Sequence, residues 1–405
     1  MTCLDFAERE KIQGNNFLNV PNLKFPEFSE DWVQYKCSDL LEFYSTNSLS
    51  WEQLDYDNND LLNLHYGLIH VGLPTLVNVE QHNLPSVKPE FKPKNYTLCK
   101  SGDIAFADAS EDTNEVAKPI EFYDCSDKQV VCGLHTIHGR DKLNATEIGF
   151  KGYAFSSMPF HHKIRRLAQG SKIYSISSKN FSEVTIGIPP KEEQRKIVDL
   201  LSKLEERITT QNKIIEDLKK LKVAITNWLI KSIPDCSEIK YLEKIADIYQ
   251  PQTIPTSALN DEADYFVYGA NGIIGKYNKY NHELSQICIT CRGNTCGNIN
   301  FSVPKSWITG NAMVVNTDEY THIVNKRYLY HYLSTINFTP LISGSGQPQI
   351  VRQPLAKLKI PIPKLEHQNK IIEVIDTFEY RIEIENKYLQ SLLSQKAYLL
   401  SNMFI

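Results

Sequence analysis

The chain has 405 residues, nine of them cysteines, and a formal net charge of −4 at pH 7. Its mean hydropathy is −0.35, and no apolar run approaches the roughly 20 residues of a membrane helix, so a helical membrane protein is excluded. The odd number of cysteines, without a regular spacing or a signal-peptide core, predicts free thiols in a soluble cytoplasmic protein of two or three domains.

Residues 1–21 are expected to form an N-terminal tail whose role the sequence does not define. A first domain is predicted over 22–188, where aromatic and β-branched residues alternate with Gly, Asn and Pro. Within it, "GDIAFADAS" (102–110) has the pattern of a strand entering a turn. This composition predicts mixed α/β structure.

A long helix is predicted over 189–232. It begins after Pro189-Pro190, carries acidic residues in its first turn and ends before "SIPD". At about 1.5 Å per residue, some 40 residues form a rod of about 60 Å, which is a spacer and not a small-domain core helix.

A second domain of the same character is predicted over 233–362, with a strand in "QICITCRG" and an amphipathic helix in "NKRYLYHYLSTI". Cys288, Cys291 and Cys296 have a spacing that zinc sites use, but no second C-x-x-C or H-x-x-x-H follows, so no metal site is predicted. "GANGIIGKY" (269–277) departs from a phosphate-binding loop, since Tyr277 replaces the Ser or Thr that would hold magnesium.

A second helical spacer is predicted over 363–405, and it repeats the first. Residues 170–230 align with 344–404 at a constant offset of 174, and 14 of the 45 positions from Ile186 to Ile230 are identical. The identical pairs include Gln194/Gln368, Arg207/Arg381 and Lys213/Lys387. We infer two diverged copies of one domain-plus-helix unit.

Apolar residues recur in both helices with a 4-3-4-3 spacing, which predicts that the helices pack against each other as a coiled coil. Polar residues interrupt the spacing at equivalent positions, Gln211/Glu385 and Lys222/Lys396. The predicted interface residues are Ile197, Leu201, Leu204, Ile208, Ile215, Leu218, Ile371, Ile375, Phe378, Ile382, Leu389 and Leu392.

Short connections between domain, helix, domain and helix require the two helices to run antiparallel. The predicted fold is therefore α+β, with two pseudo-repeated α/β domains separated by two long helices packed as an antiparallel coiled coil. Two similar domains held apart in this way could read two half-sites on DNA.

Several motifs together resemble the specificity subunits of type I restriction-modification enzymes, over nearly the whole chain. The helix openings "PPKEEQRKI" and "PKLEHQNKI" resemble the family's two helical regions, although His367 departs from the Glu of that pattern. "YGANGIIGKYNKYNHELSQICITCRGNTCGNI" resembles one type of target recognition domain, and "HYGLIHVGLPTL", "GDIAFADASED" and "GLHTIHGR" resemble another.

The resemblance implies a non-catalytic subunit that reads double-stranded DNA. Each recognition domain would bind one half of a bipartite target, the helices would set the gap, and the chain would recruit two modification (methyltransferase) subunits and two restriction subunits. S-adenosylmethionine, ATP and magnesium would belong to those partners, and no cofactor is expected in this chain. A [DNS]-P-P-[YFW] motif and a glycine-rich cofactor loop, which a methyltransferase of this kind needs, are both missing from the sequence.

Lys and Arg side chains are candidates for phosphate contacts, and long polar side chains for base edges. The candidates are Arg140, Lys142, Lys163, Arg165 and Arg166 in the first domain and Lys276, Lys279, Arg292, Gln347, Gln349 and Arg352 in the second. The strip 161–172 is equally compatible with a solvated surface. For 343–353, a simple connector is favoured slightly over a DNA-contacting loop. For the histidine pairs His135/His138 and His161/His162, structural or DNA-facing roles are favoured over metal or acid-base chemistry.

The resemblance implies that the outer faces of the helices dock the modification subunits, although a coiled pair with solvated faces could also simply hold two domains together. The sequence does not pick out the docking residues, and charge reversal at Glu193, Arg207 and Lys213 would test this surface. The alternative is a coiled-coil scaffold whose domains bind proteins or other ligands. DNA binding through phosphates would weaken with salt with a slope of about −0.9 per phosphate contact, whereas a scaffold would show no such slope. The sequence defines neither the target bases nor the gap length.

Overall fold

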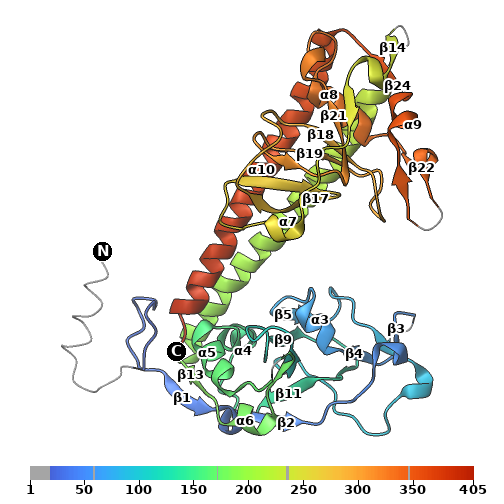
Figure 1. The fold of residues 1–405 in the computed structure, drawn as a ribbon. Coiled ribbons are helices and arrows are strands. Elements are labelled where there is room, and N and C mark those ends of the chain that lie inside the picture. Colours follow the sequence, from blue (N-terminus) through green and yellow to red (C-terminus); the bar gives the residue numbers. More distant parts are fainter. Residues whose placement is uncertain (1–18, 58–59, 171, 234–236, 345–346) are drawn as a thin grey trace. The chain divides into compact units, whose positions relative to one another are not determined.

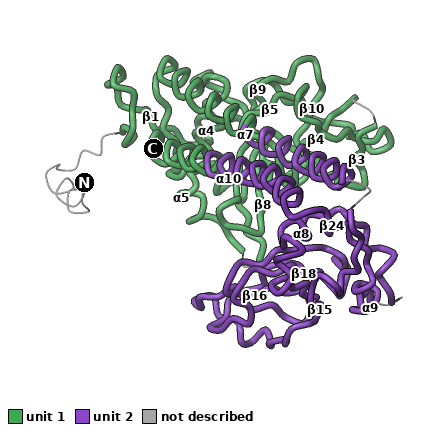
Figure 2. Tube along the Cα trace, turned by 90° about the horizontal axis from the view of Figure 1, so that it is seen from above, with its two compact units in different colours: residues 1–210, 389–405 green, residues 211–388 purple. Residues whose placement is uncertain are grey.

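The computed structural model describes residues 19–57, 60–170, 172–233, 237–344 and 347–405 (Figure 1). The predicted tail falls almost entirely outside this part of the chain. The chain divides into two compact units, unit 1 with residues 1–210 and 389–405, and unit 2 with residues 211–388 (Figure 2). In the described ranges, every helix is too short or too polar to span a lipid bilayer.

Unit 1 contains two larger sheets, two strand pairs and several short helices. The five-stranded sheet has the order β2 (Leu41–Tyr44), β11 (Thr136–Asp141), β7 (Ile104–Ala107), β9 (Pro119–Asp124) and β5 (Leu76–Asn78). The four-stranded sheet has the order β10 (Val130–Cys132), β4 (Leu62–Leu64), β6 (Ser86–Val87) and β3 (Leu54–Asp55). The strand pairs are β1 (Val33–Lys36) with β13 (Thr185–Ile188), and β8 (Ala109–Ser110) with β12 (Tyr174–Ser175). The helices are α2 (Cys37–Leu40), α3 (Tyr66–His70), α4 (Phe150–Phe155), α5 (Met158–Leu167) and α6 (Ser178–Ser182), with 3-10 turns η1 (Trp51–Gln53) and η2 (Pro89–Phe91).

The five-stranded sheet separates two hydrophobic cores of unit 1. All four residues of β7 are buried, and they alternate between the cores because successive side chains of a strand point to opposite faces. Ile104 and Phe106 join the core that contains Trp32 and the C-terminal Phe404. Ala105 and Ala107 join the core that β10 and β4 also line.

Unit 2 is built around a smaller set of sheets. The four-stranded sheet has the order β15 (Asp247–Tyr249), β21 (Ala312–Asn316), β18 (Ile287–Thr290) and β19 (Ile299–Phe301). The three-stranded sheet has the order β17 (Gly272–Tyr277), β16 (Tyr265–Gly269) and β20 (Trp307–Ile308), and the pairs are β14 (Glu238–Tyr241) with β24 (Lys359–Ile362), and β22 (Ile342–Ser343) with β23 (Gln349–Ile350). The helices are α8 (Lys326–Ser334) and α9 (Arg352–Ala356), with 3-10 turns η3 (Leu242–Lys244), η4 (Thr256–Ala258), η5 (Asp318–Tyr320) and η6 (Thr339–Leu341).

The local elements that the sequence predicts are present in the structure. "GDIAFADAS" forms β7 and β8, "QICITCRG" forms β18, and "NKRYLYHYLSTI" forms α8. "GANGIIGKY" is the hairpin of β16 and β17, in which Gly269 faces Gly272 across the turn. Gly272 has φ +104°, a left-handed conformation that glycine adopts without strain.

The two long helices, α7 (Lys191–Lys231) and α10 (Leu365–Asn402), each contribute to both units (Figure 2). In unit 2, Gln211 contacts Glu385 and Lys222 contacts Glu379. Residue numbers rise along one helix as they fall along the other, so the helices are antiparallel. The predicted α+β fold with an antiparallel coiled coil is confirmed.

Candidate nucleic-acid interface

A buried glutamine joins the start of α7 to unit 1. The Gln194 side chain is fully buried. Its amide nitrogen donates to the carbonyl oxygens of Pro189 and Ala145, at 2.8 and 2.9 Å, and its oxygen accepts from the backbone N–H of Glu147 at 2.7 Å. One side chain therefore holds three backbone groups, one directly before α7 and two in the segment before α4.

The equivalent glutamine makes the same bonds in unit 2. The Gln368 amide nitrogen donates to the carbonyl oxygens of Pro363 and Ile323, at 2.8 and 3.0 Å, and its oxygen accepts from the N–H of Asn325 at 2.7 Å. The strand before each helix also pairs in the same way. Val33 pairs with Ile188 in β1 and β13, and Glu238 pairs with Ile362 in β14 and β24. The two units thus share the same strand pair and the same glutamine contacts at the helix start, which we call the shared frame. The loops of the two units differ.

In unit 2, the structure brings three of the predicted DNA-binding residues together, on the loop after β18 and at the start of β23. Arg292 and Gln349 form an isolated antiparallel bridge, supported by a bond from the Gly293 N–H to the Pro348 oxygen at 3.0 Å. Arg292, Gln349 and Gln347 are all exposed.

A polar groove lies beside that loop. It has a volume of about 410 Å³ and is lined by Asn271, Asn298 and Asn300, together with the end of α8. The Asn298 amide nitrogen donates to the Asn271 side-chain oxygen at 3.1 Å, which ties the β16–β17 turn to the loop that follows Arg292. The sequence analysis did not select these asparagines, although the Asn-Gly turn signal and the run "GNTCGNIN" marked their positions.

The other candidates of unit 2 do not line this groove. Lys276 on β17 lies over the Phe266 ring at 5.8 Å, and Lys279 is exposed after β17. Arg352 is exposed, and its Nε donates to the Ile248 carbonyl oxygen at 2.7 Å. That bond ties the start of α9 to β15.

In unit 1, two of the predicted cations make internal contacts. The Arg140 guanidinium forms two bonds of 2.7 Å to the Asp103 carboxylate, which hold the pKa of Arg140 above its usual range. The half-buried Lys163 donates to the Thr185 carbonyl oxygen at 2.9 Å, and burial lowers the pKa of this lysine. Both contacts are structural, and the predicted role of the two residues at DNA remains untested.

The remaining candidates of unit 1 are more accessible. Lys142 is exposed and donates to the Ser38 carbonyl oxygen at 2.6 Å. Arg165 and Arg166 lie in the last turn of α5; Arg165 donates to the Asn114 side-chain oxygen at 2.9 Å, and Arg166 is exposed. The strip 161–172 thus combines half-buried and exposed cations.

Unit 1 has its own pocket, which the sequence did not predict. It has a volume of about 650 Å³, with Trp51, Tyr66, His70 and His135 in its wall. Tyr66 packs edge-on against His135 with ring centroids 5.2 Å apart, and the Trp51 side chain is 46 % exposed. Exposed aromatic rings can stack on the planar faces of bases.

All twelve predicted coiled-coil residues are buried or half-buried. Several also belong to domain cores. Ile197 and Leu201 pack in the core that contains Trp32, and Ile371 and Ile375 pack in the main core of unit 2. The beginning of each helix therefore serves both the coiled coil and its domain.

Glu193, one of the three residues chosen to test the outer helix faces, is not on an outer face. Its side chain is 1 % exposed, accepts a bond from the Trp32 indole N–H at 3.3 Å and pairs with Lys24 at 3.6 Å. Trp32 and Lys24 are far from Glu193 in the sequence but contact it in the structure. Arg207 and Lys213 are exposed.

Comparison with known proteins agrees with this architecture. Residues 126–220 and 234–394 match the family described as the type I restriction modification DNA specificity domain. A putative type I restriction enzyme specificity subunit from Haemophilus influenzae is 32 % identical over 34 % of this chain and 36 % of its own length. The putative MjaX specificity subunit from Methanocaldococcus jannaschii is 24 % identical over 91 % of this chain and 92 % of its own length.

Two solved structures share the fold. The type I restriction-modification S subunit from M. genitalium has a TM-score of 0.56 and 18 % identity, covering 95 % of this chain and 99 % of that one. A chain from a structure on complex assembly and conformational transition of the type I R-M system has a TM-score of 0.57 and 16 % identity, covering 93 % and 98 %. The match to the specificity family spans more than half of the sequence, and we conclude that the chain belongs to the type I restriction-modification DNA specificity family, as a non-catalytic part of such a system.

Proposed function

We propose that this chain reads a bipartite DNA target, with one half read by each unit, while the paired helices set the gap between the halves. The proposal rests on one observation: the shared frame is repeated in both units, but the loops around it differ. The Gln194 and Gln368 contacts are the same in both units, whereas unit 1 presents an aromatic pocket and unit 2 an asparagine groove.

The two surfaces suit different base sequences. Asparagine can donate to and accept from an adenine edge at once, so Asn271, Asn298 and Asn300 favour direct contacts in the major groove. Arg292 lies in the loop after β18, and Arg352 lies at the start of α9, three residues after the Gln349 that bridges to Arg292; both supply positive charge for phosphates or guanine. In unit 1, Trp51 and Tyr66 favour stacking contacts.

The outer faces of the helices fit the docking of two modification subunits. Apolar side chains are exposed at equivalent positions of the two repeats, Leu200 and Val374 at 38 % and 40 %, and Ile214 and Tyr388 at 40 % and 41 %. Such a repeated exposed apolar pattern favours two copies of one partner. In this proposal the restriction subunits, S-adenosylmethionine, ATP and magnesium join through those partners, in the cytoplasm.

The test is to co-express the chain with its modification subunits and map modified bases across a genome. We expect a split motif with a constant gap. Asn298→Ala should relax the specificity at positions of one half only, by about 1–3 kcal/mol per base contact. The exposed Asn294→Ala on the same loop is a matched control. Modified sites without a second half, or an Asn298→Ala effect on both halves, would contradict the proposal.

A further inference from the structure

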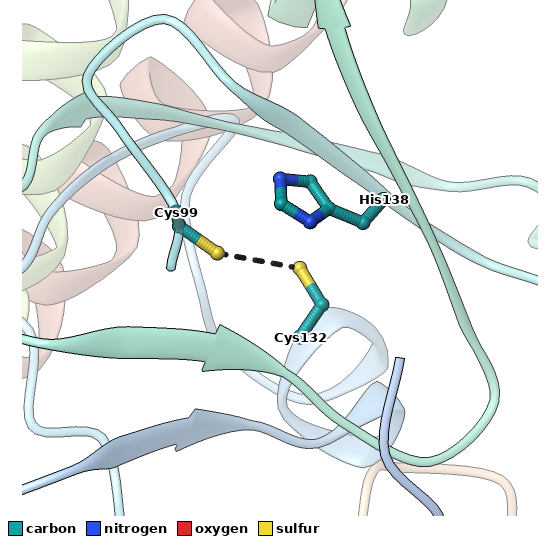
Figure 3. A group of neighbouring side chains, drawn as sticks. All are labelled: Cys99, Cys132 and His138. Atoms are coloured by element: carbon teal, nitrogen blue, oxygen red, sulfur yellow. Dashed lines mark hydrogen bonds between the residues drawn. The ribbon is translucent and has the colours of Figure 1, made fainter. Parts of the chain in front are cut away.

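Three side chains of metal-ligand type meet inside unit 1, at Cys99, Cys132 and His138 (Figure 3). Their ligand atoms lie within 4.8 Å of one another, and the two sulfur atoms are 3.6 Å apart. All three residues are buried, at 5 %, 3 % and 0 % exposure. The sequence separates the two cysteines by 33 residues, so no motif indicated the cluster.

The backbone holds these residues in place from three segments. Cys132 ends β10 of the four-stranded sheet, and His138 lies in β11 of the five-stranded sheet. Cys99 follows the bridge between Leu98 and Val131, and its N–H donates to the Val130 carbonyl oxygen at 2.8 Å. A ligand bound by all three would connect the two sheets.

The orientation of His138 leaves one ring nitrogen available. Its Nε2 lies 2.9 Å from the Asp103 carboxylate, which Arg140 holds through two further bonds of 2.7 Å. Because a carboxylate accepts, Nε2 carries the proton and Nδ1 presents its lone pair. Nδ1 is buried without a hydrogen-bond partner. A carboxylate that orients the second nitrogen of an imidazole is the usual support of a metal-bound histidine.

We propose that Cys99, Cys132 and His138 bind a zinc ion that joins the two sheets of unit 1. Two thiolates that each lie about 2.3 Å from a tetrahedral zinc ion are about 3.8 Å apart, close to the separation in this structure. Three protein ligands and a water complete a coordination that zinc adopts. The inference departs from the sequence-based expectation that the chain holds no metal.

Charge balance inside the core supports this assignment. Binding releases one proton from each thiol, and the two thiolates then neutralise the Zn²⁺ charge while the imidazole remains neutral. Asp103 and Arg140 neutralise each other beside the site. The ion would also give the unpartnered Nδ1 of His138 a bonding partner, which the described surroundings do not supply.

The first measurement is the metal content of the untagged full-length chain purified from zinc-supplemented cells. We expect about one zinc per chain in the wild type, and less than about a tenth in Cys99→Ser and Cys132→Ser. Cys37→Ser is the matched control, since Cys37 is also a buried cysteine of unit 1 but belongs to the other core. This control should retain its zinc.

A second measurement does not depend on the folding of any variant. Wild-type protein stripped with a chelator should melt at a lower temperature, recover with zinc, and show thiolate-to-metal charge-transfer absorption with Co²⁺. Absence of metal binding by the wild-type chain would overturn the proposal. It would also be overturned if peptide mapping of the purified chain, denatured without reductant, showed a disulfide between Cys99 and Cys132, since that bond would take the place of the ion.

Discussion

His331 of α8 shows how burial changes the chemistry of one side chain. It is 4 % exposed, and burial lowers its pKa from 6.5 to about 4, against the opposing effect of the Glu379 carboxylate. The nearby Arg327 works in the same direction as burial. Hence the imidazole is neutral in the folded protein at pH values where the unfolded chain would already be protonated.

The lowered pKa predicts a loss of stability in acid. The unfolded chain binds the extra proton below about pH 6.5, so the contribution of His331 is complete above that pH and is lost as the pH falls toward 4. Between pH 7 and pH 4.5 the group should remove about 2 kcal/mol from the free energy of unfolding. Urea unfolding at both pH values should show that His331→Gln removes this difference. His322→Gln, at an exposed position of unit 2, should keep it; equal pH dependence in both variants would contradict the assignment.

At the scale of the helices, a polar contact marks the register of the pair. Gln211 and Glu385 are equivalent residues of the two repeats, and the Gln211 amide nitrogen donates to the Glu385 carboxylate at 2.6 Å. Both are buried, at 4 % and 7 % exposure. The ion pair between Glu205 and Lys396 in unit 1 recurs as Glu379 with Lys222 in unit 2, as the offset of 174 requires.

Removing one partner of the Gln211–Glu385 contact should lower the free energy of unfolding more than replacing both partners with leucine. Gln211→Leu removes the amide donor to the buried Glu385 carboxylate and leaves only its pairing with the exposed Arg381, and we expect a loss of about 2 kcal/mol in the free energy of unfolding. The double variant Gln211→Leu/Glu385→Leu should recover most of that loss, because two apolar side chains can pack in the same space. Asn212→Leu at the neighbouring exposed position is the control. The single variant Glu385→Leu completes the comparison. If the double variant lost as much free energy of unfolding as the two single variants together, the pair would not interact.

At the scale of the whole molecule, the proposed gap-setting role of the helices predicts that a change in helix length changes the gap. A heptad of seven residues inserted beside Gln211 in α7, with another beside Glu385 in α10, keeps the 4-3-4-3 pattern and lengthens the pair by about 10 Å. Since B-DNA rises about 3.4 Å per base pair, the gap in the modified motif should grow by about three base pairs.

Genome-wide mapping of modified bases measures this change directly. A heptad in α7 alone should abolish modification, because the interface residues would then lose their partners along part of the pair. If the double insertion preserved activity with an unchanged gap, the helices would not set the distance between the half-targets.

The local and periodic features of this protein followed from the sequence by itself. The 4-3-4-3 spacing predicted α7 and α10, and the constant offset of 174 predicted the repeat, because both depend on residues close together or regularly spaced along the chain. The strand pattern of "GDIAFADAS" and the helix pattern of "NKRYLYHYLSTI" were also predicted from neighbouring residues.

Only the tertiary structure decided which distant side chains meet. Arg140 lies against Asp103, 37 residues away, and Glu193 is enclosed by Trp32, 161 residues away. Asn271 and Asn298 share a groove because the β16–β17 turn folds onto a later loop. Charge and polarity in a sequence do not specify partners at such separations, since the path of the chain between them determines which donors and acceptors come within bonding distance.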